Sequence, residues 1–110
     1  MKLINEFKAL ADKTRLRITV ILLERNFCVC EIMDILKMTQ SRISRHLGIL
    51  KQAGIICEER KGKWVVYKIV NKKRGLLSYI QHQIKNESIY TVDKARIKKT
   101  LRKRLCPIND

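Results

Sequence analysis

The sequence predicts a mainly α-helical domain that carries one β-hairpin. Apolar residues recur at helical spacing over most of the chain, and one short stretch alternates in the manner of paired strands. Hydrophobic residues make up 45% of the 110 residues, which is enough for a packed core and excludes an intrinsically disordered basic protein. A chain of this length supports a single core, so we expect one domain over residues 1–110.

Two consecutive helices are predicted at the start of the chain. Asp12 separates them, because its side chain can cap the free N–H groups that open the second helix. Asn26 is a plausible stop for that second helix. The apolar positions are Leu3, Ile4, Phe7, Leu10 and Ala11 in the first helix and Leu16, Val20 and Leu23 in the second.

A third and a fourth helix follow, joined by a tight turn. The third ends near Lys37, Thr39 can cap the fourth, and Gly54 fits the position just beyond its end. Their apolar residues are Ile32, Ile35 and Leu36, then Ile43, Leu47 and Leu50. Two short helices joined by such a turn form a helix-turn-helix, whose second helix is presented to the major groove of DNA.

A β-hairpin is predicted directly after the fourth helix. Residues 55–60 and 63–70 carry strand-forming side chains around Lys61 and Gly62. Helical spacing then returns beyond Asn71, with an interruption near residues 86–90; the apolar positions are Leu76, Leu77, Ile80, Ile84, Ile97 and Leu101. A hairpin in this place is a wing, and the fold class is therefore a winged helix-turn-helix.

The charge balance restricts the function. Lys and Arg total 25 against 10 for Asp and Glu, a net charge of +15, which favours nucleic acid or an anionic membrane surface as partner. No apolar run is long enough to span a membrane, and Glu6 and Lys8 interrupt the first apolar pattern, so we expect no export signal and a cytoplasmic location. We also expect no enzyme, because the chain offers no nucleophile and base pair, phosphate loop or carboxylate cluster beside a His.

Candidate DNA-binding residues lie on the fourth helix and on the wing. The helix face opposite the apolar stripe is small and polar, which allows close approach to base edges, and an Arg there can bind guanine. His46 lies at the edge of the stripe, where it packs or contacts phosphate. The candidates are Gln40, Ser41, Arg42, Ser44, Arg45 and His46 on the helix, with Arg60, Lys61 and Lys63 at the wing tip for phosphates.

The last part of the chain is strongly basic. A solvated charge run and an additional DNA contact both explain this composition, and the sequence leaves the two alternatives open. The basic residues are Lys94, Arg96, Lys98, Lys99, Arg102, Lys103 and Arg104.

Cys28 and Cys30 are the candidate metal ligands. On an ideal helix two residues at this spacing point about 200° apart, so the pair must lie at an irregular helix start or distort it on binding. Free N–H groups and the helix dipole there stabilise thiolates, which bind soft ions such as As(III) and Sb(III). The alternative to a metal site is a purely structural role, in which Cys28 and Cys30 are two small buried residues on a helix.

Residues 10–69 resemble the winged-helix core of the ArsR/SmtB family of metal-responsive repressors. TQSRISRHLGILKQAGII is similar to the recognition helix, KGKWVVYKI to the wing, and CVCEI to the inducer motif of the arsenical-repressor branch. The resemblance implies a homodimer on palindromic operator DNA that As(III) or Sb(III) releases. It also implies a core over residues 10–70, followed by dimerisation helices and a basic tail over residues 74–110.

One position departs from the family pattern. The arsenical-repressor motif often has a third cysteine where this chain has Met33. The third thiolate would then come from Cys106, from Cys57 or from a small external thiol; we favour Cys106, because a tail is free to reach the site. The second class of family site, which binds zinc through Asp and His pairs, is improbable because only His82 is in the expected region.

Two other functions remain open on the same fold. One is a thiol-redox or persulfide sensor, in which two cysteines become linked without a metal. The other is a metal-independent nucleoid-type DNA-binding protein, in which the cysteines only pack.

Overall fold

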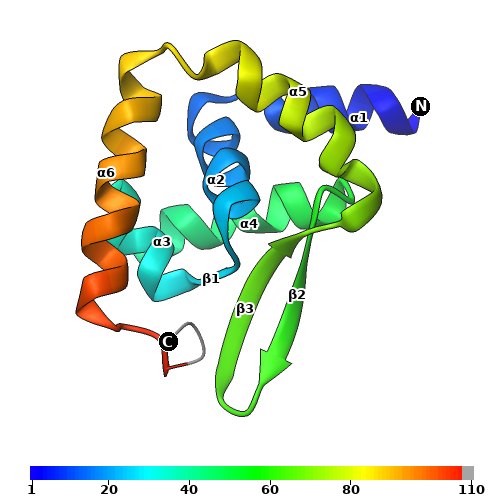
Figure 1. Ribbon diagram of the computed structural model, residues 1–110. Helices are drawn as coiled ribbons and strands as arrows, with labels where there is room; N and C mark the ends of the chain where they lie inside the picture. Colours follow the sequence, from blue (N-terminus) through cyan, green and yellow to red (C-terminus); the bar gives the residue numbers. More distant parts are fainter. Residues whose placement is uncertain (108–110) are drawn as a thin grey trace.

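The computed structural model describes residues 1–107; residues 108–110, which belong to the expected domain and basic tail, lie outside the described part. Its elements follow the chain in the order shown in Figure 1. They are α1 (Lys2–Leu10), α2 (Lys13–Glu24), β1 (Phe27–Cys28), α3 (Val29–Leu36), α4 (Gln40–Gln52), β2 (Ile56–Lys61), β3 (Trp64–Ile69), a 3₁₀ turn η1 (Asn71–Lys73), α5 (Arg74–Ile84) and α6 (Ser88–Lys103). The predicted winged helix-turn-helix is confirmed. No helix in this part of the chain is long and apolar enough to cross a membrane.

Local sequence signals set the helix boundaries. The Asp12 carboxylate accepts a hydrogen bond from the N–H of Arg15 at 3.0 Å and caps α2, as predicted. Thr39 caps α4 by accepting from the N–H of Arg42 at 3.4 Å. Gly54 follows α4 with a φ of +78°, the left-handed conformation that glycine adopts without steric cost.

The wing belongs to a three-stranded antiparallel sheet of order β1-β3-β2. Trp64 to Ile69 pair with β2 on one side, and β1 pairs with the other side, where Cys28 lies opposite Val66. The sequence predicts only the hairpin strands, because a strand of two residues shows no alternation. The added strand fixes the start of α3 against the wing.

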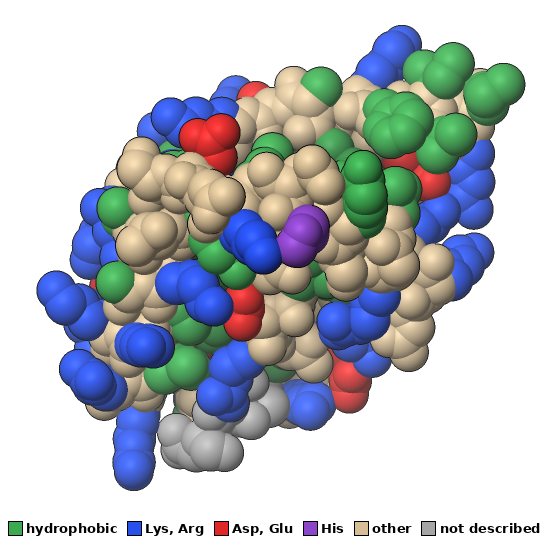
Figure 2. Space-filling view, turned by 45° about the horizontal axis from the view of Figure 1, so that its top comes forward, with side chains coloured by type: hydrophobic (Ala, Val, Ile, Leu, Met, Phe, Trp, Pro, Cys, Tyr) green, Lys and Arg blue, Asp and Glu red, His purple; other side chains and the backbone are tan. Residues whose placement is uncertain are grey.

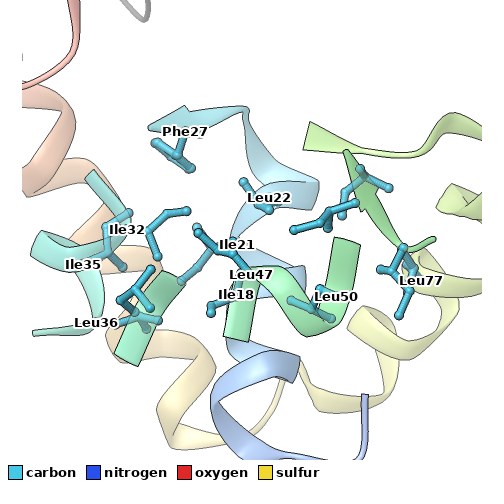
Figure 3. Close-up of a cluster of buried hydrophobic side chains, with 14 of the residues drawn as sticks. Ile18, Ile21, Leu22, Phe27, Ile32, Ile35, Leu36, Leu47, Leu50 and Leu77 are labelled. Carbon is cyan, nitrogen blue, oxygen red and sulfur yellow. The ribbon is translucent and has the colours of Figure 1, made fainter. Parts of the chain in front are cut away.

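The core lies between α2, α3, α4 and the base of the wing. Figure 3 shows Ile18, Ile21 and Leu22 of α2 directed toward side chains of α3 and α4. These three side chains are almost completely buried. Burial of such side chains is the main favourable contribution to folding. Phe27, Ile32, Ile35, Leu36, Leu47, Leu50 and Leu77 belong to the same cluster.

Polar contacts fasten α6 to the helix-turn-helix. Arg17 of α2 donates two hydrogen bonds to the Asp93 carboxylate, at 3.0 and 2.9 Å. Thr100 donates to Asp34 of α3 at 2.5 Å. The later part of α6 therefore stands beside α3, and its earlier part is joined to α2 (Figure 1). This helix begins at Ser88, within the expected interruption at residues 86–90.

Candidate functional site

The polar face of α4 is open to solvent. Gln40, Ser41, Arg42, Ser44 and Arg45 are exposed, whereas the apolar residues of the same helix are buried in the core. The inward-facing residues are Ile43, Leu47 and Leu50. The helix thus presents the small and basic side chains that suit contact with the edges of base pairs.

His46 lies inside the molecule rather than on this face. Its side chain is only 7% exposed, and its Nδ1 lies 3.2 Å from an Arg15 guanidinium nitrogen and 4.0 Å from the Asp12 carboxylate. Burial lowers the pKa of His46, and Asp12 opposes this effect only in part. Of the two roles considered for His46, packing and phosphate contact, its burial between α4 and α2 favours packing.

The wing tip carries the predicted basic residues. Arg60, Lys61 and Lys63 are exposed on either side of Gly62, which has a φ of +64°. Trp64 is partly buried against the cysteine cluster at the base of α3. The tip therefore combines exposed cations with a strand whose Trp64 is packed beneath them.

Cys28 and Cys30 lie at an irregular helix start, one of the two arrangements that the sequence allows. Cys28 has extended backbone and forms the N-cap of α3, whereas Cys30 is in the first helical turn. The N–H of Cys28 donates to the buried carboxylate of Glu31 at 2.9 Å, which holds the cap in place.

Cys106 joins these residues from the other end of the chain. Arg104, with a φ of +53°, ends α6 and turns the chain so that the carbonyl of Leu105 lies 4.0 Å from the Cys30 sulfur. Cys106 is 1% exposed and is joined to Cys28 by a disulfide, with 6.5 Å between the two Cα atoms. The described part of the tail is therefore packed at this point rather than free.

The fourth cysteine lies elsewhere. Cys57 is in β2, opposite Lys68 of β3, and is outside the buried cluster that contains Cys28, Cys106 and Val66. Of the two cysteines considered as a third ligand, the structure brings Cys106 to Cys28 and leaves Cys57 apart.

The potential metal-donor atoms that cluster at this site are mainly sulfur atoms, which are soft ligands. The sulfur atoms of Cys28 and Cys106 and a Glu31 oxygen lie within 4.8 Å of one another. Burial raises the pKa of the Cys30 thiol and the charge of Glu31 raises it further, so the thiolate stabilisation expected at this helix start does not hold for Cys30. When reduced, the cluster offers thiols to a thiophilic ion; when oxidised, it holds the Cys28–Cys106 disulfide.

A pocket of about 260 Å³ connects the cysteines to both exposed basic regions. Its lining includes Cys28, Cys30 and Met33 of the α3 region, Gln40 at the start of α4, and Lys63 and Trp64 of the wing. The cysteines therefore line the same pocket as residues at the start of α4 and at the wing tip.

Comparison with known proteins agrees with this arrangement. Residues 12–57 match the family model described as "Bacterial regulatory protein, arsR family". The chain is 45% identical over 76 residues to the arsenical resistance operon repressor of Bacillus subtilis strain 168, an alignment that covers 67% of this chain and 72% of that repressor. The chain belongs to the ArsR family.

The arsenical-repressor branch of the family is supported by a second relative. This ArsR-family chain is 48% identical over 64 residues to the arsenic resistance transcriptional regulator ArsR1 of Pseudomonas putida KT2440, covering 57% of this chain and 50% of ArsR1. The chain thus spans about half the length of that relative.

The fold of this ArsR-family chain also matches a solved structure. A homodimeric winged helix-turn-helix DNA-binding domain from Mycobacterium bovis, described as a possible ArsR-family regulator, superimposes with a TM-score of 0.69. The two are 24% identical, and the superposition covers 78% of this chain and 85% of the other. The likeness shows that the fold is shared.

Glu31 is the residue of this site that sequence reasoning missed. It is buried and caps the helix start that carries both cysteines of the CVCEI segment. The signal was present, because a Glu three residues after an N-cap position is typical of a capping box. The N-cap here is Cys28 rather than Ser or Thr, which hides the pattern.

Proposed function

We propose that this ArsR-family chain is a homodimeric repressor that binds operator DNA and releases it when As(III) or Sb(III) binds Cys28, Cys30 and Cys106. The arsenical-resistance repressors among its relatives support this proposal. The protein would act in the cytoplasm, where DNA is accessible and thiols are kept reduced.

DNA reading is assigned to α4 and the wing. Arg42 and Arg45 are exposed beside small side chains, so an Arg can reach guanine in the major groove without obstruction. Phosphate contacts are assigned to Arg60, Lys61 and Lys63, and they fix the position of the protein along the duplex.

Dimerisation is assigned to an apolar patch formed by Leu3, Ile4, Phe7, Leu76 and Tyr79. Phe7 is 49% exposed on α1 and Tyr79 is 64% exposed on α5. Figure 2 shows hydrophobic side chains gathered at the end of the molecule at which α1 begins. Several large apolar side chains exposed on α1 and α5 suit a protein interface, and a second copy of the chain is the partner that a palindromic operator requires.

The observation that carries the proposal is the shared pocket of Cys28, Cys30, Gln40 and Lys63. Cys28 and Cys30 open α3, the first helix of the helix-turn-helix, and the same pocket reaches the first residue of α4. An ion that draws the thiols together distorts the start of α3 and tilts α4. The two α4 helices of the dimer then no longer fit the two half-sites of the operator.

Cys106 is the proposed third thiolate. It lies in the same buried cluster as Cys28, with Cys30 at the edge of that cluster. Arsenic(III) prefers soft sulfur ligands, and three thiols supply them without the cysteine that Met33 replaces. Loss of Cys106 should therefore weaken the binding of arsenic(III) without abolishing it, because two thiol ligands remain.

The experiment begins with an operator selected from a random DNA pool. Fluorescence anisotropy of that duplex with reduced protein then measures release by arsenite and by antimonite. We expect both ions to release the wild type and Cys57→Ser, which serves as the matched control. Cys28→Ser and Cys30→Ser should bind the DNA normally and resist release.

Two outcomes would overturn the proposal. The DNA-binding role fails if no sequence is enriched and binding does not weaken as salt rises. The inducer role fails if Cys28→Ser and Cys30→Ser respond to arsenite like the wild type.

The Cys28–Cys106 disulfide supports a thiol-redox sensor as a second candidate. Hydrogen peroxide would take two electrons and two protons from the two thiols, forming one S–S bond and two molecules of water. This oxidation fixes the end of α6 to the start of α3. If peroxide releases the DNA while arsenite does not, and Cys106→Ser abolishes the response, the redox function replaces the metalloid function.

A further inference from the structure

We propose that the exposed face of α6 is a second DNA-binding surface, which contacts the phosphate backbone outside the segment read by α4 and the wing. The inference rests on the proposed DNA-binding function and adds a surface to it. Of the two alternatives that the sequence leaves open for the basic tail, it takes the additional DNA contact.

The charges of α6 are segregated between its two faces. Its single carboxylate, Asp93, is buried and paired with Arg17. The outward face carries Lys94, Lys98 and Arg102 at successive turns of the helix, all exposed. Within residues 1–107 no carboxylate pairs with Lys98 or Arg102.

This row of cations is unfavourable for the isolated helix. Like charges four residues apart repel, as Lys94 and Lys98 do, and Lys98 and Arg102 do in turn. A polyanion that lies along the helix removes the repulsion and gains from the release of its own counterions. Duplex DNA is the polyanion that the proposed function already brings to this molecule.

The helix is held rigidly beside the helix-turn-helix. Lys103 pairs with Asp34 of α3 at 2.8 Å, and an Arg96 guanidinium nitrogen donates to the carbonyl of Ile35 at 3.3 Å. Leu105, just beyond α6, lines a pocket together with Thr39, which caps α4. The basic end of α6 is therefore close to the end of α4 that enters the DNA.

The position of α6 places its cations toward the outside of a dimer. Figure 2 shows Lys and Arg side chains gathered on the side of the molecule where α6 lies in Figure 1, opposite the hydrophobic end where α1 begins; further Lys and Arg side chains flank that hydrophobic end. In a dimer joined through that hydrophobic end, the two copies of α6 lie at the outer ends. Their contacts then fall on DNA that flanks the two half-sites.

The test compares two doubly substituted variants with equal loss of charge. Lys98→Gln with Arg102→Gln removes cations from α6, and Lys72→Gln with Lys85→Gln removes exposed cations from the segments before and after α5. The salt dependence of binding is measured for each variant with the selected operator centred in a duplex of about 40 base pairs, and again with a duplex of about 20 base pairs that ends near the half-sites.

With the long duplex, we expect the α6 variant to have a shallower plot of the logarithm of the binding constant against the logarithm of the salt concentration. The slope should fall in magnitude by about 1 for each cation removed from a phosphate contact. With the short duplex, the slope should not change. The control variant should match the wild type. Equal slopes for the two variants, or the same loss with both duplexes, would overturn the α6 surface while DNA binding itself stands. If the wild type shows no salt-dependent binding, the proposed function fails instead.

Discussion

At the scale of single residues, Cys30 is the thiol whose reactivity the surroundings change most clearly. It lies partly buried at the first turn of α3, with Glu31 beside it in the chain. Burial first, and the Glu31 carboxylate second, raise the pKa of this thiol. Because the thiolate is the reactive form, Cys30 is kept less reactive at neutral pH than an ordinary cysteine.

Alkylation by iodoacetamide measures this effect. In the Cys57→Ser background, with the Cys28–Cys106 disulfide intact, the rate at Cys30 should rise with pH to a midpoint above that of N-acetylcysteine amide, a blocked cysteine without a carboxylate. The sign follows from the raised pKa, since at any pH below the midpoint the thiolate fraction is smaller. Mass spectrometry of the modified peptide gives the rate, and a midpoint at or below that of the free thiol contradicts this account of Cys30.

Residue roles that depend on local sequence could be predicted, and those that depend on distant contacts could not. Asp12 and Thr39 cap helices through N–H groups three residues away, so their roles follow from local sequence. His46 meets Arg15 across 31 positions of the chain. Periodicity placed His46 at the edge of the apolar stripe, and only the fold shows that it is buried.

At the scale of elements, the Arg17–Asp93 pair determines how α6 is held. Arg17 and Asp93 are 13% and 8% exposed, and two hydrogen bonds join them across 76 positions of the chain. The pair links α6 to the central helix α2. Removal of one partner leaves a buried charge without compensation, which is more costly than loss of a surface pair.

Arg17→Ala should therefore lower the free energy of unfolding by about 3 kcal/mol. Lys13→Ala, an exposed cation of the same helix, should change it by less than about 0.5 kcal/mol. Urea unfolding followed by circular dichroism measures both values. Similar small effects of the two substitutions would show that the pair does not hold α6.

The helices and the hairpin could be predicted because each carries its own periodic pattern. The strand β1 could not, since Phe27 and Cys28 form a strand only through pairing with Tyr67 and Val66. The meeting of Cys106 with Cys28 is likewise invisible to periodicity, because it depends on α6 being packed against α3 and on the turn at Arg104. The family pattern suggested the cysteines, and the fold supplies their proximity.

At the scale of the whole molecule, the apolar patch and the basic surfaces lie on different sides. The patch around Phe7 and Tyr79 is next to the base of the wing, since Glu6 of α1 pairs with Lys73 of η1 at 2.7 Å. The cations that the proposed function assigns to DNA lie on α4, the wing and α6. A dimer formed through the patch leaves all of these cations available to DNA.

Phe7→Glu should convert the dimer to a monomer, because it places two like charges within the proposed interface. Val92→Glu changes an exposed apolar residue of α6, which is 40% exposed and lies outside the patch, and should leave the dimer intact. Sedimentation equilibrium gives the mass of each variant. A monomeric wild type, or a dimeric Phe7→Glu variant, would contradict the assigned interface.

The central claim is that Cys28, Cys30 and Cys106 together bind arsenic(III). X-ray absorption at the arsenic edge, with reduced protein and one equivalent of arsenite, measures this directly. The account predicts three sulfur neighbours for arsenic in the wild type and in Cys57→Ser, and two in Cys106→Ser. An arsenic atom surrounded only by oxygen in the wild type, or three sulfur neighbours that persist in Cys106→Ser without added thiol, would contradict it.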